Sequence, residues 1–208
     1  MARYTGPVCK VCRREGGKLF LKGQRCYTDK CAIVTRENPP GQHGQGRIRT
    51  SEYRIHLREK QKVRSTYGLS ESQFKRYYEI ARSQRGATGE NLLVLLERRL
   101  DNIVYRSGFT TSRAEARQLI DHGHFRVNSR KTDIPSYLVK AGDVIEVKEK
   151  SKTLHAIVEA LEIREQRGSA EWIEVDANAR KATVKALPER KDLPMAVEER
   201  LIVEFYSK

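Results

Sequence analysis

All four cysteines of this 208-residue chain lie in one short stretch near its N-terminus, VCKVCRREGGKLFLKGQRCYTDKCAI, residues 8–33. Cys9 and Cys12 form a C-x2-C pair, and Cys26 and Cys31 form a C-x4-C pair thirteen residues later. A short C-x2-C segment places two thiolates on one side of a tetrahedral ion, and a second pair completes such a site. The spacing therefore predicts a structural four-cysteine metal site, with Zn²⁺ as the expected ion.

Two other interpretations of the four thiols stay open. An iron–sulfur cluster also takes four cysteine ligands, and buried thiols without a ligand are the simplest alternative. The N-terminal residues MARYTGPVCK contain no apolar stretch of signal-peptide length, and the longest apolar run, NLLVLL, is far too short for a membrane span. We therefore expect a cytoplasmic protein, in which reduced cysteines bind metal more often than they form disulfides.

The chain is strongly basic, and its charge is unevenly distributed. It carries 41 Lys and Arg against 27 Asp and Glu, a formal net charge of +14. Residues 1–60 hold 14 basic and 5 acidic side chains, whereas residues 141–208 hold 12 basic and 14 acidic ones. Neutralising phosphates releases condensed counterions, so this asymmetry indicates a nucleic-acid partner. The alternative interpretation is a basic protein with scattered, solvated Lys and Arg side chains.

Helical patterns fill the segment after the cysteines. The stretch NPPGQHG predicts a loop because Pro and Gly dominate it. Helices are predicted over residues 51–68 and 70–86, each preceded by hydroxyl side chains suited to an N-cap. The apolar residues of about 90–106 predict one continuous helix that would serve as a central strut.

The segment from RRLDN to DVIEV carries the most specific pattern. Ser112 and Glu115 form a capping box that opens a short helix, and Gly123 ends it. The next residues, FRVNSRKTDI, predict two short strands joined at Asn128 and Ser129, and DVIEV predicts a third strand. A basic helix beside a basic hairpin suits the backbone of structured RNA, which proteins recognise by its shape and ribose contacts.

Within this segment, TSRAEARQLIDHGHFRVN followed by KAGD resembles the αL-type RNA-binding motif of the S4 family of bacterial small-subunit ribosomal proteins. The start MARYTGPVCKVCRREG, the NPPGQHG loop, LREKQKVRSTYGLSESQF and the closing LIVEFYSK resemble the same family. The resemblance therefore extends almost from end to end, and it corresponds to the branch of the family with a metal-bound N-terminal arm.

The resemblance implies a structural component of the small ribosomal subunit that binds 16S rRNA directly at a multi-helix junction and nucleates early assembly. It also implies contact with neighbouring ribosomal proteins, a position near the mRNA entry path, an influence on translational accuracy, and repression of its own mRNA as a further role. It implies no enzymatic activity, no membrane partner and no small-molecule substrate.

The fold class expected from these patterns and the resemblance is α+β. A metal-bound arm with an extended loop would occupy residues 1–45, and a helical domain would occupy 46–97, completed by about 188–208. Between these two parts, 98–187 would form an inserted αL RNA-binding domain and its extension, with a small, mainly antiparallel sheet.

The residues expected to contact RNA are cations and polar side chains of the arm, the loop, the first long helix and the αL segment. They are Arg3, Lys10, Arg13, Arg14, Lys18, Lys22, Arg25, Gln42, His43, Arg47, Arg49, Arg54, Arg58, Lys60, Lys62, Arg64, Arg113, Arg117, His122, His124, Arg126 and Lys131.

One position departs from the family pattern. Many relatives have Asn-Gly at the hairpin where this chain has Asn128 and Ser129. A two-residue type I′ turn requires positive φ at both central positions, which Gly tolerates and Ser does not. We therefore expect either a different turn or a mildly strained one.

Two other classes of protein compete with the ribosomal interpretation. An RNA-modifying enzyme or an RNA-binding regulator can carry an αL domain, but the sequence shows no Gly-rich phosphate loop, nucleophile elbow or paired-carboxylate site. A zinc-containing DNA-binding regulator would need a recognition helix and usually dimer symmetry, and neither is apparent.

Overall fold

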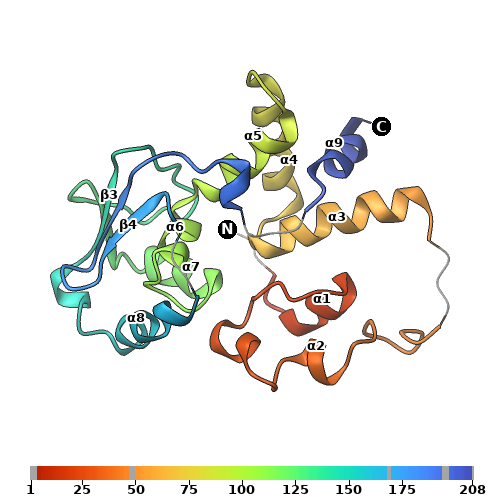
Figure 1. Ribbon diagram of the computed structural model, residues 1–208, viewed down its shortest axis with the longest axis horizontal. Helices are drawn as coiled ribbons and strands as arrows, with labels where there is room; N and C mark the ends of the chain where they lie inside the picture. The colour runs from red at the N-terminus through yellow and green to blue at the C-terminus, as the bar shows by residue number, and fades with distance from the viewer. Residues whose placement is uncertain (1–3, 47–49, 168–169, 194–196, 208) are drawn as a thin grey trace. The chain divides into compact units, whose positions relative to one another are not determined.

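The computed structural model describes residues 4–46, 50–167, 170–193 and 197–207, apart from the side chains of 165–167 (Figure 1). The chain divides into two compact units, one comprising Met1–Leu92 with Met195–Lys208 and the other comprising Leu93–Pro194. The predictions for Arg3, Arg47 and Arg49 lie outside the described residues. No helix within the described ranges is both long enough and apolar enough to cross a membrane.

The arm of the first unit consists of short helices joined by turns: α1 (Val8–Glu15), the 3-10 helix η1 (Gly23–Tyr27) and α2 (Ala32–Thr35). α1 ends at Gly16, whose φ of 67° is the left-handed conformation that glycine tolerates. Leu19 and three of the four cysteines are buried here. The arm therefore has a small core centred on thiols rather than on large apolar side chains.

Two longer helices follow the arm, α3 (Glu52–Thr66) and α4 (Glu71–Ser83). The predicted N-caps are confirmed, because the hydroxyl of Ser51 accepts from the Arg54 N–H and that of Ser70 from the Gln73 N–H, each at 3.3 Å. The buried stripe of α4 consists of Phe74, Tyr77, Tyr78 and Ala81.

The C-terminal helix α9 (Glu199–Ser207) packs against α3. The Tyr206 hydroxyl donates to Oε1 of Glu71 at 2.8 Å, and the Lys60 ammonium donates to the same oxygen at 2.7 Å. Lys60 also lies 4.6 Å from the centroid of the Phe205 ring. One carboxylate thus joins α3, α4 and α9 through two donors.

The predicted continuous helix over about 90–106 is wrong. The structure has α5 (Thr88–Glu97) and α6 (Leu100–Arg106), and Arg99 between them is extended, with φ −66° and ψ 139°. The N–H groups of Leu100 and Asp101 donate to the carbonyls of Tyr137 and Pro135, at 2.9 and 3.1 Å. A loop distant in sequence therefore satisfies the first turn of α6, which hydropathy alone does not reveal.

The second unit is built on a five-stranded sheet in the order β2-β1-β3-β5-β4, with every neighbouring pair antiparallel. The prediction of a small, mainly antiparallel sheet is confirmed. Its strands are β1 (Phe125–Val127), β2 (Arg130–Lys131), β3 (Val144–Val147), β4 (Ile173–Asp176) and β5 (Lys181–Val184).

Helices pack on the apolar face of this sheet. α7 (Arg113–Asp121) is capped by Ser112, whose hydroxyl accepts from the Glu115 N–H, and it ends before Gly123 at φ 72°. α8 (His155–Arg167) follows a 3-10 turn, η2 (Glu149–Ser151). A last 3-10 turn, η3 (Arg190–Asp192), follows β5. The fully buried centre of the core is formed by Leu100, Ile103, Val104, Phe109, Ala116, Ile120, Phe125, Ile145, Ile157 and Ala182.

The hairpin between β1 and β2 keeps the two-residue turn despite its serine. Asn128 has φ 49° and Ser129 has φ 64°, so both central residues are left-handed, as a type I′ turn requires. The Asn128 side chain compensates by bonding β3: its Oδ1 accepts from the Val144 N–H at 2.9 Å, and its Nδ2 donates to Asp143 at 2.8 Å. Of the two expected alternatives, the structure has the strained turn.

We expect Ser129→Gly to stabilise the protein by on the order of 1 kcal/mol. The left-handed conformation disfavours a residue with a Cβ by about 1–2 kcal/mol, and the extra unfolded-state entropy of Gly offsets part of this gain. Urea unfolding followed by fluorescence of Trp172, the single tryptophan and a core residue of the same unit, measures the change. Gly142→Ser is the reverse control, because Gly142 has φ 88° and an added Cβ meets no atom within 4 Å. A Ser129→Gly midpoint at or below wild type would contradict the prediction.

Candidate nucleic-acid interface

Two arginines of α1 hold the Pro- and Gly-rich loop. Nε of Arg13 donates to the Asn38 carbonyl at 2.8 Å, and Nη2 of Arg14 donates to the Pro40 carbonyl at 3.1 Å. The loop folds so tightly that a Cβ on Gly44 would lie 2.0 Å from the Pro39 carbonyl oxygen. Both arginines therefore organise the loop backbone, in addition to whatever charge they present outward.

The remaining predicted contacts of the arm and loop are placed at the surface. Arg25 is exposed and donates from Nε to the Lys30 carbonyl at 3.1 Å. The other exposed side chains of this set are Lys10, Lys18, Lys22, Gln42 and His43.

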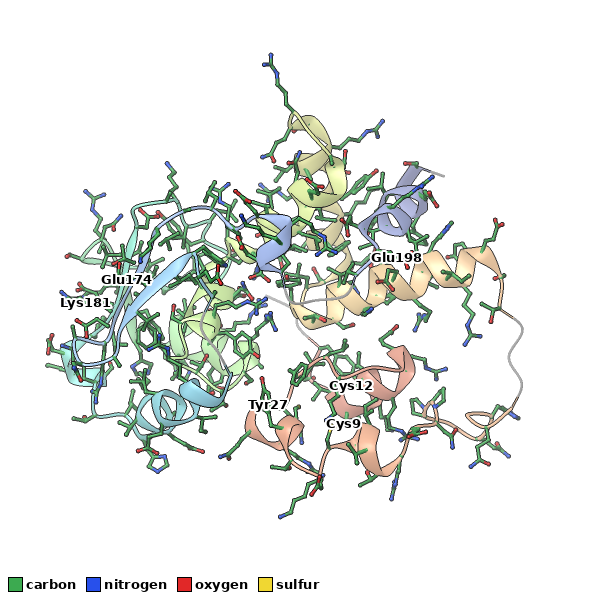
Figure 2. The ribbon with its side chains drawn as sticks, viewed as in Figure 1. Cys9, Cys12, Tyr27, Glu174, Lys181 and Glu198 are labelled. Atoms are coloured by element: carbon green, nitrogen blue, oxygen red, sulfur yellow. The ribbon has the colours of Figure 1, made fainter. Side chains whose placement is uncertain are left out.

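The four cysteines are free thiols brought together inside the arm (Figure 2 labels Cys9 and Cys12 on α1). Cys12, Cys26 and Cys31 are buried and Cys9 is half-buried. Burial raises the pKa values of Cys12 and Cys26, and the negative charges of the other cysteines add to the rise. The Lys22 N–H donates to the Cys26 sulfur at 3.3 Å.

The chemistry of this donor set suits a soft cation, because thiolate sulfur is a preferred zinc ligand and the Lys22 N–H donates to the sulfur of Cys26. As they are arranged, however, no group of three or more His, Cys, Asp or Glu among the described residues could hold a metal ion. The predicted metal site stays a prediction.

The cations predicted on α3 are largely engaged within the protein. Lys60 is only 3% exposed and is paired with Glu71, so it does not present its charge to an RNA surface; its prediction as an RNA contact does not fit its burial. The other predicted cations of α3 are half-buried. They are Arg54, Arg58, Lys62 and Arg64. Arg58 forms an ion pair with Glu15 at 3.0 Å and Lys62 forms one with Glu59 at 3.3 Å, while Nε of Arg64 donates to Oε1 of Gln61 at 2.7 Å.

The two arginines predicted on one face of α7 also have internal partners. Arg113 donates from Nε to Oδ1 of Asn102 at 2.8 Å, and its guanidinium lies 4.5 Å from the centroid of the Tyr105 ring. Arg117 is buried, with 7% exposure. Burial raises the pKa of the Asp101 carboxyl, and the positive charge of Arg117 is among those that oppose this rise. Arg117 is therefore largely inside the unit, and its contact with RNA stays a prediction.

A cluster of basic side chains lies where α7 ends against the hairpin. We call it the αL basic surface; its members are His122, His124, Arg126, Lys131 and Lys148. The first four were predicted; His124 and Lys148 are half-buried and the other three are exposed. The Lys148 N–H donates to the His124 carbonyl at 2.9 Å. Lys148 was missed because its place depends on the pairing of Phe125 with Val147 across β1 and β3, which no local pattern fixes.

Charges on the rest of the exposed sheet face are balanced. Lys181 on β5 lies 3.6 Å from Glu146 on β3, and Lys185 lies 3.4 Å from Glu174 on β4 (Figure 2 labels Glu174 and Lys181). The register places Arg126 opposite both Lys131 and Glu146, at the point where the balanced half meets the basic half. On this face of the sheet, the positive charge that is not balanced in this way therefore lies toward the β1–β2 edge.

Comparison with known proteins covers the chain from end to end. Residues 3–97 match the family model described as "Ribosomal protein S4/S9 N-terminal domain", and residues 98–145 match the "S4 domain". The chain is similar to proteins named "Small ribosomal subunit protein uS4" from Geobacter sp. (strain M21), at 62% identity, and from Citrifermentans bemidjiense, at 61%. The corresponding protein of Geobacter sulfurreducens is 58% identical. Each match covers 208 residues, 100% of both chains.

The αL basic surface lies largely within the segment that matches the S4 domain, and the cysteine arm lies within the N-terminal match. Taken together, these findings place the chain in the uS4 family of small ribosomal subunit proteins.

Proposed function

We propose that this chain is a structural, non-catalytic component of the small ribosomal subunit that binds 16S rRNA directly. The observation that carries the proposal is the αL basic surface, where cations gather on a rigid α7–hairpin unit while charges on the neighbouring sheet face are paired. Structured RNA is bound mainly through its phosphates and its shape, which a fixed array of cations matches. The sequence identity of 62% over the full length to a protein named uS4 supports the same role.

Several finer roles belong to the same proposal. The chain would nucleate early assembly of the subunit, contact neighbouring ribosomal proteins and lie near the mRNA entry path, where it would influence translational accuracy. Such a protein is cytoplasmic and works on the ribosome. Repression of its own mRNA would use the same RNA-binding surface.

We also propose that the cysteine arm holds a structural Zn²⁺ through Cys9, Cys12, Cys26 and Cys31. The support is the donor chemistry: free thiols on short helices and turns, and a backbone N–H directed at one sulfur. The ion would supply folding energy to an arm whose own apolar core is small. An iron–sulfur cluster on the same residues is the alternative.

The competing class is an RNA-modifying enzyme or regulator that uses its αL domain for recruitment. The match to uS4 proteins over 100% of both chains disfavours this class, because proteins named as ribosomal account for the whole chain. Co-sedimentation separates the classes: the proposed protein should run with the small subunit through a sucrose gradient in moderate salt. A protein found only in the ribosome-free fractions would contradict the proposal.

Neutralising exposed arm lysines should weaken RNA binding and reduce its salt dependence. We expect Lys10→Gln/Lys18→Gln/Lys22→Gln to make the slope of log K against log salt shallower by up to roughly 2 to 3, at about 0.7–0.9 for each phosphate that is no longer neutralised. Filter binding to a small-subunit rRNA transcript across a salt series measures it. The matched control is Lys75→Gln/Lys150→Gln/Lys185→Gln, three exposed lysines outside the predicted contacts. Equal slopes for both triple variants would mean that the arm charges do not contact RNA.

Reduced, freshly purified protein should contain about one Zn²⁺ per chain, as expected for a single four-cysteine site. Cys26→Ser should remove the metal and make the arm sensitive to protease, because metal binding supplies the arm's folding energy. Trp172, which is 5% exposed in the other unit, should keep its emission maximum. Elemental analysis and limited proteolysis test these outcomes; several irons with sulfide would favour the cluster, and neither metal would reject both.

A further inference from the structure

The turn that ends α7 brings two ammonium groups together. Gly123 is buried, with φ 72°, and the position of a Cβ there would lie 3.6 Å from Nζ of Lys148 and 3.9 Å from Nζ of Lys131. The two lysines come from different places: Lys131 ends β2, and Lys148 directly follows β3. Both positive groups thus lie within 4 Å of one point over Gly123, and the Lys131 side chain covers that point with its Cε at 3.1 Å.

The surroundings of this point are positive. His122 and His124 lie beside it, with ring centroids 6.1 Å apart. The pKa of His124 is lowered, first by burial and then by the positive charges of His122 and Lys148. Lys131 has one acidic neighbour, Asp133, at 3.9 Å, and both of these side chains are more than half exposed, so the pair is weak. In the part of the chain that the structure describes, Lys148 forms no ion pair.

The C-terminal end of α7 offers a simpler explanation for a lysine beside Gly123. The C-terminal end of a helix carries partial negative charge, so α7 itself attracts cations to Gly123. That effect accounts for one lysine, but it is weak at an exposed helix end and is screened by salt. It does not explain why a second ammonium group lies at the same point, where the one acidic partner among the described residues is the exposed Asp133 of Lys131.

We propose that Lys131, Lys148 and the Gly123 turn form a binding site for one phosphate of the RNA backbone, shared by the two ammonium groups. Each ammonium has three donors and no acceptor, and a phosphate offers oxygens to both at once. Because Gly123 lacks a side chain, the Lys131 side chain can lie across the turn, with its Cε 3.1 Å from the position that a Cβ would take, and this places its ammonium group near that of Lys148. The inference rests on the proposed rRNA binding and assigns to it one specific contact, which includes a residue outside the predicted contact set.

The test is a double-mutant cycle on RNA binding with the full chain. Lys131→Gln, Lys148→Gln and the double variant are titrated with a small-subunit rRNA transcript across a salt series, with Lys185→Gln as the control of equal charge change. A shared phosphate predicts that each single variant binds more weakly than the control, and that the double variant lowers the slope by only about 0.7–0.9, the value for one phosphate. Lys148→Arg keeps the charge and should keep most of the affinity.

Two outcomes overturn the shared site. A double variant that lowers the slope by roughly twice the value for one phosphate would show two separate phosphates. A Lys148→Gln variant that binds like Lys185→Gln would show that Lys148 does not contact RNA. If wild-type protein does not bind the transcript at all, the proposed function fails first, and these results differ from that case because they require intact wild-type binding.

Measurements without RNA separate a phosphate site from a helix-end role. If Lys148 only stabilises the end of α7, Lys148→Gln should lower the thermal midpoint and leave the RNA slope unchanged, and that pair of results would overturn the proposal. A phosphate site predicts an unchanged or higher midpoint, because the substitution removes like-charge repulsion.

The titration of His124, followed by NMR, adds a direct probe of the site. Lys148→Gln should raise the pKa of His124, because a positive neighbour that disfavours the protonated imidazole is removed. In the wild-type protein, RNA binding should also raise the pKa of His124, because a bound phosphate favours the protonated imidazole. In the double variant this rise should be smaller. No rise on RNA binding in wild type would argue against a phosphate at this turn.

Discussion

The second unit depends on one buried carboxylate, that of Glu97 at the end of α5. Glu97 is 1% exposed, and it accepts from Nδ2 of Asn102 at 2.6 Å and from Nη2 of Arg106 at 2.8 Å. Oδ1 of Asn102 in turn accepts from Arg113 on α7. A buried charge is tolerated only when it is paired and hydrogen-bonded, so these bonds tie the end of α5 to α6 and, through Asn102, to α7. This hydrogen-bond network therefore orients α7, the helix whose C-terminal end lies in the αL basic surface.

Local chemistry explains which parts of the fold could be predicted from the sequence. Each of the helix caps at Ser51, Ser70 and Ser112 joins residues only three apart, so each can be predicted from the local sequence alone. The break at Arg99 could not be predicted from the sequence, because it is caused by hydrogen bonds to the loop carbonyls of Pro135 and Tyr137. The leucines on both sides of Arg99 also continue the apolar pattern of a single helix. Register across the sheet was equally hidden, since strand pairing joins residues far apart in sequence.

The same limit applies to the cations. Composition correctly indicated a basic protein. The sequence alone, however, does not distinguish a lysine or arginine that contacts RNA from one that stabilises the fold. Lys60 and Arg117 are buried beside carboxylates, and Arg13 and Arg14 bond loop carbonyls, whereas Arg126 and Lys131 stand exposed. Only burial and partners separate the groups. A count of basic residues therefore overstates the number of phosphates that the protein binds, and a salt slope measures that number directly.

The hairpin turn connects backbone strain to the geometry of the αL basic surface. The left-handed residues Asn128 and Ser129 disfavour the turn, yet the side chain of Asn128 bonds the N–H of Val144 and the carboxylate of Asp143. These bonds lock β2 and β1 to the start of β3, so Lys131 on β2 keeps a fixed place relative to Lys148 after β3. Side chains positioned before RNA arrives lose less conformational freedom on binding, so a larger share of the charge attraction appears as affinity. The position of the hairpin therefore depends on the side-chain bonds of Asn128, while Ser129 contributes only its left-handed backbone to the turn.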